Sequence, residues 1–253
     1  MSSPFIHLRV SSEFSISRGL LRINEIIANA EKFNMPAVAL TDLNNMFGMV
    51  KFFKKAEAAG IKPIAGTILN LGSHDGEQGE ILCLAKNNAG LKSLMGIISN
   101  AQLQQSNGKI SISFDDLSSC VGNIIVIAGG PLSNIFNLSK YQKLNDLNTE
   151  LKVFKETFGE DFCIEIQRLG KESEEDFIQC ILPLASQFSI PVIASNDSMF
   201  SQREDFDIHE TKVCINTGKT LNDPNRKKLY THEQFFKSTK DIADLFSDCG
   251  AET

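Results

Sequence analysis

Short apolar runs alternate with longer segments of helical periodicity along almost the whole chain. The runs that we predict to be strands cover residues 5–10, 36–41, 61–71, 81–85, 124–128, 162–166 and 191–195. The predicted helices cover residues 20–33, 48–59, 90–104, 140–158 and 172–188 and a stretch through His209 to Ile215. Such alternation predicts a parallel α/β sheet, and its repetition favours a closed barrel. Because no linker rich in Pro, Gly or Ser divides the sequence, we expect one domain over residues 1–253.

Three local signals refine this pattern. Pro183 lies within the segment 172–188 and is expected to bend or restart that helix. Thr231 and Gln234 have the spacing of a capping box, which predicts a last helix that begins there. Gly129 and Gly130 follow the predicted strand 124–128 without the spacing of a phosphate-binding fingerprint. We therefore expect a tight strand-to-helix turn at these two glycines.

Two of the predicted strands end in an aspartate. Asp42 follows the strand 36–41, and Asp197 follows the strand 191–195 after Ser195 and Asn196. In an α/β barrel, catalytic side chains are usually found at the C-terminal ends of the strands. Two strands that bring a carboxylate to one rim would suit a metal or general-base site, if the other ligands were present.

The composition argues against several classes of function. The formal net charge is −6 and the longest basic run is residues 226–228, read as a solvated turn, so broad binding of a nucleic-acid backbone is not indicated. The six cysteines include no Cys-x-x-Cys pair, which argues against a zinc knuckle. His74 is expected to be an exposed loop histidine. With no apolar stretch of about 20 residues and no signal-peptide pattern, we expect a cytoplasmic protein without a membrane segment.

Several ordered blocks of sequence carry a family resemblance. They include Phe5-Ile-His-Leu-Arg-Val-Ser-Ser-Glu-Phe-Ser15, Ala39-Leu-Thr-Asp-Leu-Asn-Asn-Met-Phe-Gly48 and Asp207-Ile-His-Glu210. Further blocks lie at residues 60–66, 84–87, 195–197 and 217–225. Together they resemble the polymerase-and-histidinol-phosphatase (PHP) domain at the N-terminus of bacterial DNA polymerase III alpha subunits, over essentially the whole chain. The resemblance implies a distorted (β/α)7 barrel.

Metal-bearing members of this family hold a cluster of His, Asp, Glu and Cys ligands at the strand ends, where the metals activate water and neutralise phosphoryl oxygens. Mapped onto this chain, that rim consists of Arg9, Ser11, Asp42, Leu43, Ile68, Glu80, Gly130, Asp197 and Met199. Only Asp42 and Asp197 keep a ligating side chain, and Glu80 is a candidate substitute. The resemblance therefore implies a vestigial rim with no catalytic residue, no metal and no cofactor.

Arg9 would place a fixed positive charge where the metals of the family lie. We expect it to pair with Asp42 or Asp197, so that a salt bridge replaces the metal charge. His7 and His209 match the family pattern outside the ligand positions. Each is expected to be a hydrogen-bonded structural histidine.

The resemblance implies a non-catalytic PHP scaffold at the head of a replicative polymerase. Its expected partners are the remainder of the alpha subunit and the proofreading 3′–5′ exonuclease (epsilon) subunit, with DNA reached only through the parent enzyme. The palm and fingers of that DNA-directed DNA polymerase, a nucleotidyltransferase, would lie beyond residue 253. The alternative is an active metal-dependent phosphoesterase or 3′–5′ exonuclease, which would need Glu80, His7 or His209 to rebuild a site. An unrelated sugar- or phosphate-processing barrel is a third alternative, since fold does not fix function.

Overall fold

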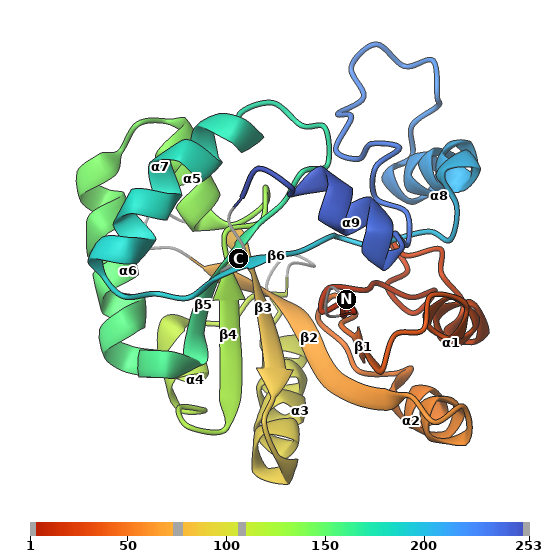
Figure 1. The fold of residues 1–253 in the computed structure, drawn as a ribbon, viewed down its shortest axis with the longest axis horizontal. Helices are drawn as coiled ribbons and strands as arrows, with labels where there is room; N and C mark the ends of the chain where they lie inside the picture. The colour runs from red at the N-terminus through yellow and green to blue at the C-terminus, as the bar shows by residue number, and fades with distance from the viewer. Residues whose placement is uncertain (1–3, 73–77, 106–109, 250–253) are drawn as a thin grey trace.

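A single curved sheet forms the centre of the molecule. The computed structural model describes residues 4–72, 78–105 and 110–249. The six strands pair in sequence order: β1 (Ala37–Leu40), β2 (Lys62–Gly72), β3 (Gln78–Ala85), β4 (Ile124–Ala128), β5 (Phe162–Ile166) and β6 (Val192–Ala194). Figure 1 shows helices around this sheet, with α1 and α2 beside β1 and β2, and α5 to α7 on the side of β4 and β5.

The sheet is mixed, which corrects the prediction of a parallel sheet. β1 pairs with β2 in parallel, as do β4 with β5 and β5 with β6, but β3 runs antiparallel to both of its neighbours. Only residues 73–77 separate β2 from β3. A parallel crossover needs about a dozen residues, so this connection permits only an antiparallel pair.

The predicted first strand, residues 5–10, is not a regular strand but lies where a seventh strand would. On one side, the backbone N–H groups of Ala39 and Thr41 donate to the carbonyls of His7 and Val10, both at 2.9 Å. On the other side, the backbone N–H of Ser198, which follows β6, donates to the carbonyl of Arg9 at 3.1 Å, and the N–H of Ser11 donates to the carbonyl of Ser198 at 2.9 Å. The segment therefore connects β1 with the chain that leaves β6. The result is a distorted α/β barrel, as expected.

The helices are α1 (Ile23–Lys32), α2 (Met49–Ala58), α3 (Asn88–Leu103), α4 (Phe114–Ser118), α5 (Asn134–Lys140), α6 (Leu144–Phe158), α7 (Glu174–Gln187), α8 (Phe206–Thr217) and α9 (Thr239–Leu245). The predicted helix 140–158 begins four residues later, because a turn with Gln142 at φ 57° separates α5 from α6. Pro183 lies inside α7 without restarting it. The helix expected at Thr231 is absent; α9 begins after Ser238, whose side chain caps it together with Asp241. No described helix is long and apolar enough to cross a bilayer.

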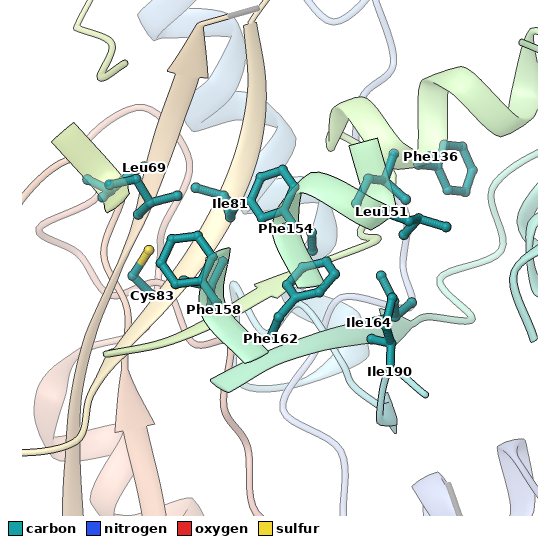
Figure 2. Packing of buried hydrophobic residues seen from close by; sticks show 14 of the residues in the cluster. Leu69, Ile81, Cys83, Phe136, Leu151, Phe154, Phe158, Phe162, Ile164 and Ile190 are labelled. Carbon is teal, nitrogen blue, oxygen red and sulfur yellow. The ribbon is translucent and has the colours of Figure 1, made fainter. Parts of the chain in front are cut away.

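Side chains alternate between the two faces of the sheet, and the apolar core divides into an outer layer, made of two clusters beneath the helices, and an inner layer. The outer layer packs beneath the helices, and in Figure 2 the rings of Phe154, Phe158 and Phe162 lie together in it. Phe154 and Phe162 stack with ring centroids 5.0 Å apart. The inner layer fills the barrel and consists of Ala39, Ile68, Leu82, Leu84 and Ile127. This inner layer forms an apolar floor beneath the rim where the parallel strands end.

Candidate functional site

Two glutamates stand above the apolar floor because of strand alternation. Leu82 on β3 belongs to the inner layer, so Glu80, two residues earlier on the same strand, faces the same side. Cys163 on β5 packs against the inner layer, and Glu165 is the next inward residue toward the strand end. The side chain of Glu165 is fully buried, and that of Glu80 is 10% exposed.

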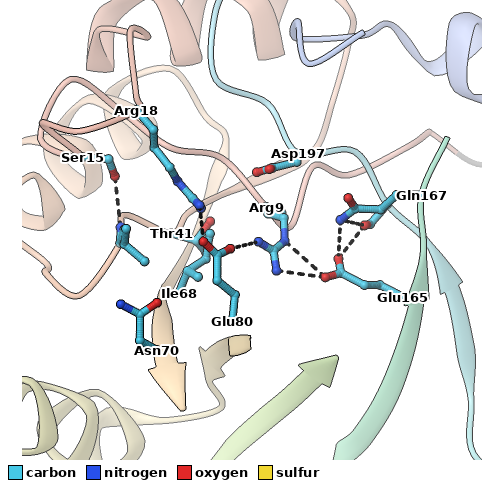
Figure 3. A network of polar contacts seen from close by, with 12 residues as sticks. Arg9, Ser15, Arg18, Thr41, Ile68, Asn70, Glu80, Glu165, Gln167 and Asp197 are labelled. Carbon is cyan, nitrogen blue, oxygen red and sulfur yellow. Dashed lines mark hydrogen bonds and ion pairs between the residues drawn. The ribbon is translucent and has the colours of Figure 1, made fainter. Parts of the chain in front are cut away.

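The guanidinium group of Arg9 lies between these two carboxylates, as Figure 3 shows. Its Nη1 is 3.0 Å from Glu80 Oε2, and its Nη2 is 3.0 Å from Glu165 Oε1. A second guanidinium, that of Arg18, donates from Nη1 to Glu80 Oε1 at 2.5 Å. Burial by itself would lower the pKa of Arg9, but the charges of Glu165, Asp197 and Glu80 outweigh it and raise that pKa. Both arginines therefore remain cations.

Glu165 is held on its other side by neutral donors. Its Oε2 accepts hydrogen bonds from Ser195 Oγ at 2.6 Å and from Gln167 Nε2 at 3.0 Å. Gly130, two residues after β4, lies directly above this carboxylate. A Cβ at Gly130 would stand 2.8 Å from Glu165 Oε1 and 3.3 Å from Arg9 Nη2. The missing side chain at residue 130 is thus what makes room for the ion pair.

Asp42 does not contact Arg9, which corrects one of the two expected pairings. Its carboxylate accepts hydrogen bonds from the backbone N–H of Ser12 at 2.7 Å, from Ser12 Oγ at 2.8 Å and from Ser15 Oγ at 2.6 Å. Burial raises the pKa of Asp42, although these hydrogen bonds oppose the shift. Asp42 therefore fixes the loop that contains Ser12 and Ser15, and Ser15 Oγ also accepts from the backbone N–H of Leu43.

Asp197 does not form the other expected pairing with Arg9. Its Oδ2 accepts a hydrogen bond from Gln234 Nε2 at 3.1 Å, and its Oδ1 has no partner among the described residues. Gln234 Nε2 also contacts Met199 Sδ at 3.5 Å. The longer glutamates reach Arg9 in the middle of the barrel, whereas each aspartate is held at the rim by its own neighbours.

The remaining rim positions carry no ionised ligand. Ser11 is buried, and its Oγ lacks a hydrogen-bond partner within the described part of the chain. Ile68 is a fully buried member of the apolar floor and pairs with Leu43 in a short parallel bridge. Met199 is also fully buried. These positions contribute packing rather than charge.

The two interior histidines are hydrogen-bonded, as expected. His7 Nε2 donates to the carbonyl of Lys237 at 2.8 Å, and its Nδ1 accepts from Ser198 Oγ at 3.1 Å. His209 Nε2 donates to the carbonyl of Arg18 at 2.6 Å. Burial lowers the pKa of both and takes that of His7 to about 4. Neither ring nitrogen of His7 is free to bind a ligand.

The residues present do not fit the metal cluster of the family. Among residues 4–72, 78–105 and 110–249, no three His, Cys, Asp or Glu side chains are grouped so that they could hold a metal ion. A cation between Glu80 and Glu165 would have to displace the guanidinium of Arg9. His74 lies outside the described residues.

Arg18, Glu165 and Gln167 belong to this network but were missed by the sequence analysis. Glu165 left a signal, because it is the one charged residue in the apolar run 162–166. Arg18 lies in a turn and left no such signal.

Comparisons with known proteins place this chain in a family. The family model described as the PHP domain matches residues 7–169. The DNA polymerase III subunit alpha of Pseudomonas aeruginosa is 37% identical over 251 residues, which cover 98% of this chain but 21% of that protein. That of Vibrio cholerae is 34% identical over 254 residues, with 98% and 22% covered. The chain thus spans about a fifth of the length of the curated relatives that it matches.

Solved structures agree with the fold. An amidohydrolase from Chromobacterium violaceum superposes with a TM-score of 0.54 at 15% identity, covering 77% of this chain and 87% of that one. A protein provisionally described as a metal-dependent phosphoesterase from Bifidobacterium adolescentis gives a TM-score of 0.52 at 13% identity, covering 77% and 88%. At these identities the likeness concerns the fold alone. From the family match and the barrel together, this chain belongs to the PHP domain family.

Proposed function

We propose that this chain is a non-catalytic PHP scaffold of a replicative DNA polymerase III alpha subunit. The observation that carries the proposal is the buried ion pair of Arg9 with Glu80 and Glu165, at the rim where the resemblance to metal-bearing PHP domains puts the metal ligands. The relatives at 34–37% identity that bear the name of that subunit support the setting.

The network lacks the chemical means for metal-dependent hydrolysis. Phosphoester cleavage of that kind needs a metal-bound water and positive charge on the phosphoryl oxygens. Arg9 and Arg18 are cations that cannot serve as general bases. The carboxylate oxygens of Glu80 and Glu165 already accept hydrogen bonds from these arginines and from neutral donors. A closed charge network of this kind favours a structural role.

The proposed scaffold supports the polymerase body and carries the proofreading 3′–5′ exonuclease (epsilon) subunit in the cytoplasm. Its formal net charge of −6 fits a domain that meets DNA only through the parent enzyme, since phosphate binding depends on clustered Lys and Arg.

Two assays test the two halves of this proposal. In the first, the chain is incubated with 3′-labelled single-stranded DNA and with p-nitrophenyl phosphate in the presence of Mn²⁺ or Zn²⁺. We expect no turnover above that of an Asp42→Asn, Asp197→Asn double variant, which serves as the control for a contaminating nuclease. Metal-dependent turnover that disappears in the double variant would show an active phosphoesterase and overturn the non-catalytic role.

In the second assay, the exonuclease subunit of Pseudomonas aeruginosa is titrated into the chain in a calorimeter. A dissociation constant of about 10 μM or tighter is expected of a stable partner. Heat no greater than that of dilution would remove the exonuclease from the proposal and leave the question of catalysis to the first assay.

A further inference from the structure

Four large apolar side chains are strongly exposed near the rim end of the barrel. Ile16 is 71% exposed, Phe47 67%, Val50 70% and Leu103 85%. Isolated apolar residues on a surface are ordinary, whereas apolar residues on adjoining segments mark a contact surface. We name these four residues the Phe47 patch.

Hydrogen bonds bring the three segments that carry the patch together. Asn45 Nδ2 donates to the carbonyl of Phe14 at 3.1 Å, which joins the loop before α2 to the loop of Ile16. Gln102 Nε2 donates to the carbonyl of Asn44 at 3.2 Å, which joins the end of α3 to the same loop. The patch therefore belongs to one area of the surface.

The buried network fixes this area in place. Asp42 holds the loop of Ile16 through Ser12 and Ser15, and Glu80 holds its far end through Arg18. The loop of Phe47 is also fixed, because Asn45 Oδ1 accepts from the backbone N–H of Phe47 at 3.2 Å. A surface that is ordered before binding loses little conformational entropy when it is covered.

We propose that the Phe47 patch is the docking surface for the remainder of a DNA polymerase III alpha polypeptide, an inference that rests on the proposed function above. The matched relatives extend over about five times the length of this chain, so each carries a large tethered neighbour of the domain. A tether supplies an effective concentration in the millimolar range. A tethered partner can therefore dock with less buried area than the roughly 800 Å² that each partner of a stable untethered complex buries.

The partner surface should have an apolar centre within a charged rim. The border of the Phe47 patch includes the ion pair of Lys51 Nζ with Glu13 Oε1, at 3.7 Å. Ile208 and Ile215 on α8 are 60% and 78% exposed and provide a matched control surface. Figure 1 shows α8 well separated from α2, the helix that carries Val50 of the patch.

Hydroxyl-radical footprinting tests the proposal without altering the patch. Residues 1–253 replace the matched region of the Pseudomonas aeruginosa alpha subunit, and the oxidation rate of each side chain in the chimera is compared with that in the isolated chain. Rates for Phe47 and Leu103 should fall roughly fivefold or more, because side chains that are 67% and 85% exposed would enter an interface core. Rates for Ile208 and Ile215 should stay within twofold, about the scatter expected of side chains that remain exposed.

Other outcomes overturn the inference in distinguishable ways. Protection of Ile208 and Ile215 in place of the patch would refute the inference but keep the scaffold function. Protection of the patch in the isolated chain that rises with its concentration would assign the patch to a second copy. Protection that appears only when the exonuclease subunit is added would assign it to that subunit. No protection on either surface would refute the inference and the scaffold function together.

Discussion

Replacing Arg9 with alanine should destabilise the protein strongly. Arg9 is 3% exposed, and its guanidinium lies 3.0 Å from the carboxylates of both Glu80 and Glu165. Removing one partner of a buried ion pair costs about 3–5 kcal/mol of the free energy of unfolding. Glu80 keeps Arg18 and Glu165 keeps its hydrogen bond from Ser195, so we expect a loss near the lower end, about 3 kcal/mol.

A double-mutant cycle measured by urea unfolding tests whether this loss arises from the unpaired charge that remains on Glu165. The variants are Arg9→Ala, Glu165→Gln and the two combined. The amide keeps the shape of the carboxylate without its charge, so the double variant should exceed Arg9→Ala in stability by about 1–2 kcal/mol. Lys152→Ala is the matched control, because its ion pair with Glu156 is 64% exposed on both sides and should contribute less than about 0.5 kcal/mol. An Arg9→Ala loss as small as that of the control would refute the reasoning.

Two further predictions concern the space above the network and the buried histidine. Gly130→Ala should lower the free energy of unfolding by about 1–3 kcal/mol, because its Cβ would press on the Arg9–Glu165 pair. Gly96→Ala is the control: this residue lies in α3 with open space around it, and the change should raise the free energy of unfolding by about 0.5–1 kcal/mol. Thermal unfolding compares the two variants, and equal shifts in their unfolding temperatures would contradict the packing argument. The pKa of His7 falls from 6.5 to about 4 on folding, so between these pH values the unfolded chain binds a proton at His7 that the folded chain does not. The free energy of unfolding should therefore rise with pH between about 4 and 6.5. Urea midpoints across that range should depend less on pH in His7→Gln, and identical pH slopes would show that His7 does not titrate in this way.

The periodic parts of the fold were predictable from the sequence. Helices α1, α2, α3 and α7 and most strands lie close to their predicted ranges, because each of these helices has one apolar face that must be buried. The direction of β3 was missed, although the short connection of residues 73–77 dictates it. The helix expected at Thr231 failed because its capping-box spacing instead forms a turn, in which the side chain of Gln234 accepts from the backbone N–H of Thr231.

The partners of Arg9 could not be predicted from the sequence. Pairing depends on which side chains the strand register brings within reach, and Glu165 lies 156 residues away in the sequence. The two expected partners, Asp42 and Asp197, are already held by serine and glutamine donors. The three-dimensional register therefore decides how the charge of Arg9 is compensated.

Metal retention distinguishes a rim closed by the Arg9 ion pairs from one that binds metal. The chain is incubated with Zn²⁺ or Mn²⁺, desalted and measured by elemental mass spectrometry beside a metal-bearing PHP phosphoesterase as the control. We expect less than about a tenth of an equivalent, since a metal would have to break the Arg9 ion pairs before it could bind. Retention near one equivalent, lost in an Asp42→Asn, Asp197→Asn variant, would contradict it and would show that the rim still binds metal.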